Sequence, residues 1–117
     1  MRVMIAEDSE SVRFALKLLL EYLGHEVVAI ATDGLDALEQ FDRSHPEMVL
    51  MDVRMPGMDG LTCTTRLAER DPQARVVIVT AGRTTEREAR QAGARGFLEK
   101  PFDMILVDQV LHAAAAA

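Results

Sequence analysis

Five charged or hydroxyl side chains each follow a short apolar run, and together they could act on a phosphoryl group. They are Glu7 and Asp8 after residues 3–6, Asp52 after 48–51, Thr80 after 76–79, and Lys100 after 96–99. A pair of carboxylates about 4 Å apart repels by about 4 kcal/mol at an effective dielectric constant near 20. One ammonium group cannot offset three carboxylates, whereas a hard divalent cation can, and oxygen ligands suit Mg²⁺ better than zinc.

A cation, an ammonium and a hydroxyl are also what a transferring phosphoryl group requires, because they neutralise charge and supply oriented donors. Asp52 would then be the nucleophile, since a carboxylate can carry a phosphoryl group as an acyl phosphate. Taken singly, each residue has an ordinary explanation: acids at a helix N-terminus, a hydroxyl at a strand end, a solvated lysine. Their arrival at one edge of a sheet favours the chemical interpretation.

The stretch 48–60 shows how such an edge is built. Residues 48–51 are all apolar and predict a buried strand of a parallel sheet, which delivers Asp52 to its carboxyl end. Open α/β sheets keep their ligand sites there. Pro56, Gly57 and Gly60 turn the chain away, and Asp59 can cap the helix that follows.

The rest of the chain repeats this alternation of strand and helix. Strands are predicted at 3–6, 27–31, 48–51, 76–79 and 96–99, with a helix after each; the third runs from about residue 60 to 69. Ser9 or Asp8 can cap the first helix, Thr85 and Glu88 have capping-box spacing, and Asp103 can cap the last. Strict alternation indicates a doubly wound parallel sheet with helices on both faces.

Composition limits the class of protein. The 117 residues, 49% hydrophobic and 27% charged, predict one globular domain over 1–117. No apolar run could cross a bilayer and the N-terminus does not resemble a signal peptide, which favours the cytoplasm. Cys63 is the only cysteine, so no disulfide is possible within the chain, and it is expected at a packing position of a helix. The net charge of −6 argues against direct nucleic-acid binding.

The combination of motifs resembles the receiver domain of two-component response regulators over essentially the whole chain. The resemblance rests on Glu7-Asp8, Asp52 followed by Met55-Pro56 and Asp59-Gly60, Thr80-Ala81, Gly93-Ala94, and Lys100-Pro101. It implies a flavodoxin-like (CheY-like) three-layer sandwich with strand order 2-1-3-4-5.

The resemblance also implies a site. Asp52 would accept a phosphoryl group from a phosphohistidine on a sensor histidine kinase or phosphotransfer protein, or from a small phosphodonor. Mg²⁺ would be held by Asp8, Asp52 and the backbone carbonyl of Arg54, with Glu7 acting through water. Thr80 and Lys100 would bind the phosphoryl oxygens.

A conformational switch is implied as well. Thr80 would move toward the phosphoryl group, and Phe97 would turn inward behind it. Lys100-Pro101 is expected to be a cis peptide, which proline makes accessible.

Three departures from the family pattern bear on this site. Glu7 stands where the family often has the shorter aspartate. Arg54 brings a cation close to the phosphoacceptor, where it could guard or reorient the phosphoryl group and alter its hydrolysis. The span from Thr80 to Lys100 is about two residues shorter than usual, so the start of the fourth helix around residues 82–84 is expected to be displaced or loose.

Two surfaces could bind partners. Phe14 and Leu18 form a second apolar stripe on the first helix, for which extra core is the favoured interpretation and docking of a kinase or phosphotransfer helix the alternative. Arginines 83, 87, 90 and 95 surround the fourth helix, whereas the last helix region offers acids. A phosphorylation-favoured homodimer through the fourth helix, fifth strand and fifth helix is therefore a candidate.

The sequence thus predicts a phosphorylation-dependent signalling switch rather than an enzyme acting on metabolites. One alternative is a pseudo-receiver, an interaction module that keeps the fold without phosphorylation, and the intact acidic residues, Thr80 and Lys100 speak against it. Another is a Mg²⁺-dependent phosphohydrolase with an aspartate nucleophile, but such enzymes typically place that residue after the first strand of a longer chain.

Overall fold

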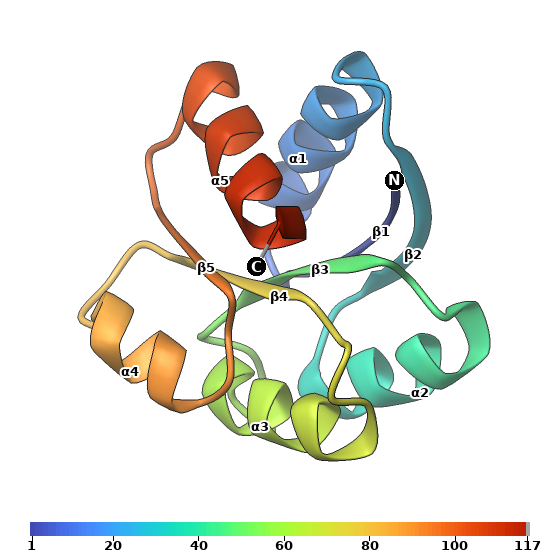
Figure 1. Ribbon diagram of the computed structural model, residues 1–117, viewed down its shortest axis with the longest axis vertical. Helices are drawn as coiled ribbons and strands as arrows, with labels where there is room; N and C mark the ends of the chain where they lie inside the picture. Colours follow the sequence, from blue (N-terminus) through green and yellow to red (C-terminus); the bar gives the residue numbers. More distant parts are fainter. Residues whose placement is uncertain (117) are drawn as a thin grey trace.

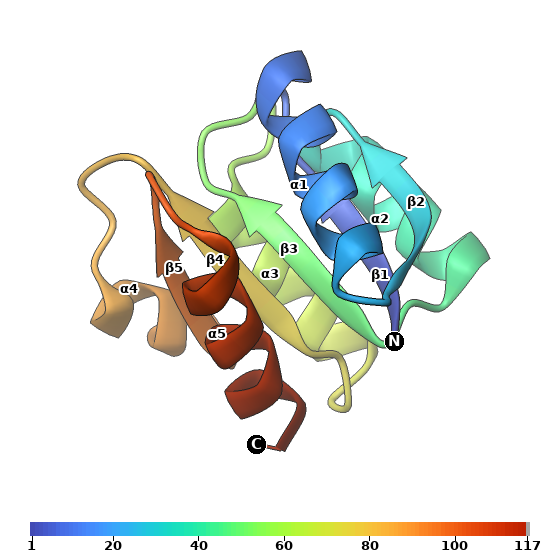
Figure 2. The same ribbon diagram turned by 90° about the horizontal axis from the view of Figure 1, so that it is seen from above.

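The computed structural model describes residues 1–116 and contains one five-stranded parallel sheet. Its strand order is β2-β1-β3-β4-β5, as expected from the resemblance (Figures 1 and 2). The strands are β1 (Arg2–Ala6), β2 (Glu26–Ala31), β3 (Met48–Asp52), β4 (Val76–Thr80) and β5 (Gly96–Glu99). The three inner strands β1, β3 and β4 each have a neighbouring strand on both sides, and all residues of β3 and β4 are buried.

Helices cover both faces of the sheet, as Figure 1 shows. One face carries α1 (Glu10–Tyr22) and α5 (Met104–Ala116), and the other carries α2 (Gly34–Ser44), α3 (Gly60–Arg70) and α4 (Glu86–Gln91). Alternate strand residues feed two apolar cores: Val3 and Ile5 join Leu16 beneath α1, whereas Met4 packs on the opposite side. The predicted burial of Cys63 is confirmed.

The predicted caps set where the helices begin. The Asp59 carboxylate accepts the Thr62 N–H at 2.9 Å, and the Asp103 carboxylate accepts the Leu106 N–H at 2.8 Å. Thr85 forms the predicted capping box at the start of α4. These bonds satisfy N–H groups that a helix leaves without a partner in its first turn.

Some predictions need correction. Phe14 and Leu18 are 64% and 53% exposed, so the interpretation of this stripe as extra core is wrong. The reason is that α1 contacts the sheet through Leu16 and Leu20, and Phe14 and Leu18 lie on the outer side of the helix. Ser9 is the N-cap residue of α1, yet its side chain makes no capping hydrogen bond.

Residues 81–85 separate β4 from α4 and include the stretch 82–84, where a displaced or loose helix start was predicted. The helix has six residues and begins at Glu86, six positions after the end of β4. None of the helices within residues 1–116 is long and apolar enough to cross a bilayer.

Candidate functional site

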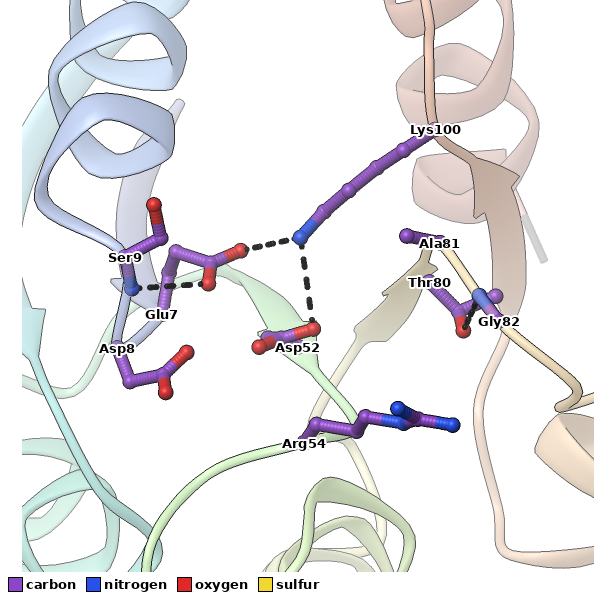
Figure 3. Close-up of a pocket in the computed structure, with 9 residues that line it drawn as sticks. All are labelled: Glu7, Asp8, Ser9, Asp52, Arg54, Thr80, Ala81, Gly82 and Lys100. Carbon is purple, nitrogen blue, oxygen red and sulfur yellow. Dashed lines mark hydrogen bonds and ion pairs between the residues drawn. The ribbon is translucent and has the colours of Figure 1, made fainter.

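The predicted site residues converge on one pocket at the carboxyl edge of the sheet. The pocket has a volume of about 240 Å³ and is bounded by the loops that follow β1, β3, β4 and β5. Figure 3 shows its lining residues, which are Glu7, Asp8, Ser9, Asp52, Arg54, Thr80, Ala81, Gly82 and Lys100. All of the predicted phosphoryl and metal residues are among them, whereas Phe97 is not.

Glu7 is the most buried of the three acids, with 1% of its surface exposed. It directly follows β1, which lies between β2 and β3 in the sheet, and it forms part of the pocket wall. Its two oxygens have separate partners: Oε1 accepts from Lys100 Nζ at 2.8 Å, and Oε2 accepts from the Ser9 N–H at 3.2 Å. A buried carboxylate requires such partners, because leaving it unpaired would cost several kcal/mol.

Asp52 ends β3 and is 6% exposed. Its Oδ1 lies 3.6 Å from Lys100 Nζ. Burial, together with the hydrogen bond and negative charge of the neighbouring Glu7, raises the pKa of the Asp52 carboxyl group to about 7, although the Lys100 ammonium opposes this shift. The acid therefore sits where its negative charge is poorly stabilised by the protein alone.

Lys100 bridges the two buried acids from the other side of the pocket (Figure 3). Burial alone would lower the pKa of Lys100, but its hydrogen bond to Glu7 and the charges of Asp52 and Glu7 outweigh burial and raise it. The Lys100-Pro101 bond is cis, as predicted, and the Lys100 N–H donates to the Thr80 carbonyl at 2.7 Å. The ammonium group is thus held between β1 and β3 as a permanent cation.

Glu7, Asp8 and Asp52 can each offer one carboxylate oxygen, and these three oxygens lie within 4.8 Å of one another. Asp8 is exposed, so it faces the open side of this cluster. An all-oxygen donor set that leaves room for water fits Mg²⁺. The raised pKa of Asp52 points the same way, because a nearby cation would relieve the repulsion that causes part of the shift.

Thr80 and Phe97, the two predicted switch residues, lie on the neighbouring strands β4 and β5. Thr80 is buried, and its Oγ1 accepts the Gly82 N–H at 3.1 Å. Phe97 is half-buried and packs against the core beneath α3 and α4. Thr80 therefore lines the pocket, whereas Phe97 does not and packs against the core.

The Arg54 side chain does not point at Asp52 but lies across the rim toward Gly82 (Figure 3). A methyl group added at Gly82 would stand 3.5 Å from Arg54 Nη2, so the guanidinium lies beside this glycine in ordinary van der Waals range. Arg54 therefore links the loop after β3 with the loop after β4.

Two residues at this edge were not singled out from the sequence for their role here. A side chain at Gly60 would overlap the backbone oxygen of Asp52, so the close approach of α3 to the end of β3 requires glycine. Arg13 Nη1 donates to the carbonyl oxygens of Glu7 at 3.0 Å and Asp8 at 2.8 Å. Glycine at 60 was a detectable signal, whereas nothing local distinguishes Arg13 from a solvated helix arginine.

Comparison with known families now agrees with this geometry. The sequence model of the response regulator receiver domain matches residues 3–112. The chain belongs to this family. Among curated relatives, the chemotaxis protein CheY of Bacillus subtilis is 38% identical over 114 residues, covering 96% of this chain and 92% of its own length.

Other relatives include regulators of different architecture. The transcriptional regulatory protein PdtaR of Mycobacterium tuberculosis is 39% identical over 105 residues, which is 88% of this receiver domain but 51% of PdtaR. The CheY of Thermotoga maritima is 34% identical over 113 residues, covering 95% of this chain and 94% of its own. Similar receiver sequences thus occur both alone and within longer proteins.

Solved structures give the same fold. A CheX–CheY–BeF₃–Mg²⁺ complex from Borrelia burgdorferi matches with a TM-score of 0.92 at 28% identity, covering 97% of this chain and 87% of that one. A LuxR-family two-component response regulator from Aurantimonas matches with a TM-score of 0.92 at 31% identity, covering 98% and 84%. Receiver domains are signalling modules, and these matches do not favour the phosphohydrolase alternative.

Proposed function

We propose that this receiver domain is switched by phosphorylation of Asp52. The donor would be a phosphohistidine on a sensor histidine kinase or phosphotransfer protein, or a small acyl phosphate. The observation that carries the proposal is the placement of the Asp52 carboxylate, buried at 6% exposure and 3.6 Å from Lys100 Nζ, in a pocket that also holds two further acids. Such a carboxylate is costly to keep without a ligand to neutralise it.

In the transfer step, an oxygen of ionised Asp52 forms a bond to the phosphorus atom. The bond from phosphorus to the donor oxygen or nitrogen breaks, and the donor leaves with the electron pair. Lys100 supplies a fixed positive charge to a phosphoryl oxygen, and the Thr80 hydroxyl can donate to another. Water later attacks the phosphorus, the bond from phosphorus to the Asp52 oxygen breaks, and inorganic phosphate leaves while the carboxylate is regenerated. The domain thus catalyses only its own phosphorylation and dephosphorylation.

Asp8 and Asp52 would hold Mg²⁺ together with the Arg54 backbone carbonyl, and Glu7 would act through water. When bound, the ion neutralises the charge of the carboxylates and of the phosphoryl oxygens. The Glu7 carboxylate is already occupied by Lys100 and the Ser9 N–H, which supports an indirect role for it.

The switch would begin at Thr80. Its hydroxyl oxygen accepts from Gly82, which leaves its own proton available for a phosphoryl oxygen. Movement of Thr80 toward the phosphoryl group would vacate space into which Phe97 turns. Because Phe97 lies on β5 beside α4, the face formed by α4, β5 and α5 would report the phosphorylated state to an output.

Intact-mass measurement tests the proposal. The protein is incubated with acetyl phosphate and Mg²⁺, with and without a chelator, beside Asp52→Asn. We expect the mass of one phosphoryl group to be added only with Mg²⁺ and only when Asp52 is present. Absence of this gain in a protein that binds Mg²⁺ would overturn the proposal and favour the pseudo-receiver.

Arg54 is proposed to modulate the lifetime of the phosphorylated form. The guanidinium lies beside Gly82, and Arg54 lines the pocket that would hold the phosphoryl group, so it can affect the approach of water. We expect Arg54→Ala to change the hydrolysis rate measured by loss of the phosphorylated mass. An identical rate in both proteins would contradict this role.

Two partner surfaces remain proposals. The exposed Phe14 and Leu18 could receive an apolar helix of a kinase or phosphotransfer protein. A homodimer through α4, β5 and α5 would use Arg87, which is exposed, more readily than Arg90, which already pairs with Glu86 at 3.1 Å. A solution mass of the phosphorylated protein that is unchanged by Arg87→Glu with Arg90→Glu would exclude such a dimer.

A further inference from the structure

Arg13 reaches back from α1 to the loop that carries the acidic residues. Its Nη1 donates to the carbonyl oxygens of Glu7 at 3.0 Å and Asp8 at 2.8 Å. Arg13 is half-buried and does not line the pocket, so it cannot touch a bound phosphoryl group. Its contacts with the site are made through the backbone.

The peptide group between Asp8 and Ser9 transmits this contact. Its carbonyl accepts from Arg13, and its N–H, which points the opposite way in a planar trans peptide, donates to Glu7 Oε2 at 3.2 Å. Glu7 Oε1 accepts in turn from Lys100 Nζ at 2.8 Å, and Lys100 lies 3.6 Å from Asp52. Hydrogen bonds therefore connect Arg13 to Lys100, and an ion pair connects Lys100 to the phosphoacceptor.

A charged donor on the carbonyl polarises the peptide and strengthens the bond that its N–H makes to Glu7. Both carbonyls also turn toward Arg13, which fixes the backbone from which the Asp8 carboxylate extends. Without Arg13, the loop after β1 would lose the only side chain within residues 1–116 that donates to both of these carbonyls.

We propose that Arg13 is a positioning residue for the metal and phosphoryl site: it orients Asp8 and Glu7 through the backbone of the loop after β1. This inference rests on the proposed function. It competes with a simple charge effect, because a cation near the site repels Mg²⁺ and its removal would then tighten binding. The direction of the change in Mg²⁺ affinity decides between the two.

The chain contains a matched control at the opposite edge of the sheet. Arg2 donates from Nη1 to the His45 carbonyl at 2.7 Å and from Nη2 to the Ser44 carbonyl at 2.6 Å. It is the same kind of guanidinium bond to two consecutive carbonyls, placed away from the acids. Arg2→Gln removes the same charge and the same type of bonds without touching the loop after β1.

Calorimetric titration with MgCl₂ tests the inference on the wild type, Arg13→Gln, Arg13→Lys and Arg2→Gln. Outer-shell substitutions at metal sites typically weaken binding by about tenfold, and we expect Arg13→Gln to raise the Mg²⁺ dissociation constant by about that factor. Arg13→Lys keeps one charged donor and should lie in between, about threefold weaker. Arg2→Gln should bind as the wild type does.

Unchanged or tighter Mg²⁺ binding by Arg13→Gln would overturn the inference. If that variant does not fold by circular dichroism, Arg13→Lys carries the test, and a dissociation constant equal to that of the wild type would overturn it. A wild-type protein that binds no Mg²⁺ would refute the proposed function itself, which distinguishes the two failures.

Discussion

The two edges of the parallel sheet use similar bonds for different purposes. At the amino edge, where the strands begin, the Arg2 guanidinium donates to the two carbonyls at the end of α2. The Met1 ammonium lies 3.0 Å from His25 Nδ1 at the same edge. At the carboxyl edge, the Arg13 guanidinium donates to the carbonyls of Glu7 and Asp8. The amino-edge bonds close a loop, whereas the carboxyl-edge bonds support buried charge.

Burial creates this difference. Arg2 and its partners are exposed, so their bonds exchange with water at little net gain. Glu7 and Asp52 are 1% and 6% exposed; the Ser9 N–H and Lys100 compensate the charge of Glu7, and Lys100 lies 3.6 Å from Asp52. A site that holds charge out of water is poised to gain free energy when a ligand neutralises it.

Replacing a glycine by alanine should destabilise the protein much more at the carboxyl edge than at the amino edge, and this is the largest difference that we expect. Gly60→Ala places a methyl group on the Asp52 backbone oxygen, and we expect it to destabilise the protein by about 3 kcal/mol or more, since neither backbone can move freely. At the amino edge, Gly24→Ala has open space and suffers only from its φ of +90°, at a cost of about 1 kcal/mol. Urea denaturation of both variants measures this, and equal losses would contradict the close packing at Gly60.

Asp52 should make the stability of the protein depend on pH. The pKa of Asp52 is about 7 when folded and about 3.9 when unfolded, so the folded state binds more protons between these values and loses stability as the pH rises. Asp52→Asn should therefore stabilise the metal-free protein at pH 8 by about 2 kcal/mol, and much less at pH 4.

Chemical denaturation at several pH values, with a chelator present, measures this effect. The exposed Asp42, paired with Arg70 at 2.6 Å, provides the control, because Asp42→Asn should change stability by less than about 1 kcal/mol at any pH. A destabilised Asp52→Asn at pH 8 would show that Lys100 compensates the buried charge fully.

Magnesium should stabilise the folded protein through the acidic residues of the carboxyl edge alone. At a concentration ten times its dissociation constant, Mg²⁺ should add about 1.4 kcal/mol to the free energy of unfolding, since it binds the folded state alone. Asp8→Asn should abolish this gain, whereas Glu47→Gln, which removes an amino-edge carboxylate that accepts the Arg2 N–H, should keep it. Thermal unfolding with MgCl₂ or a chelator is the measurement, and a gain that survives in Asp8→Asn would place the ion elsewhere.

The smallest effect is expected from His25 at the amino edge, with the opposite sign to Asp52. Burial lowers the pKa of His25, assisted by the N-terminal ammonium and His112 and opposed by Asp108. The unfolded state then binds more protons below about pH 6.5, so stability falls as the pH drops. His25→Gln should remove this part of the pH dependence between pH 7 and 5, and an unchanged profile would mean that His25 titrates normally.

Sequence alone predicted the strand and helix alternation, the caps at Asp59, Thr85 and Asp103, and the residues that meet at the pocket. These features follow from local rules: apolar periodicity, capping chemistry, and the fact that parallel strands end at a common edge. The family resemblance added the strand order, which periodicity does not encode.

Tertiary structure decided what depends on neighbours distant in the chain. The Lys100–Glu7 ion pair joins residues 93 positions apart, and the exposure of Phe14 and Leu18 depends on which side of α1 faces the sheet. Arg13 resembles any solvated helix arginine until the turn of the β1 loop brings two carbonyls to it. Contacts of this kind are set by the packing of whole elements, because the sequence of a single segment does not determine the angle and distance at which a helix packs on the sheet.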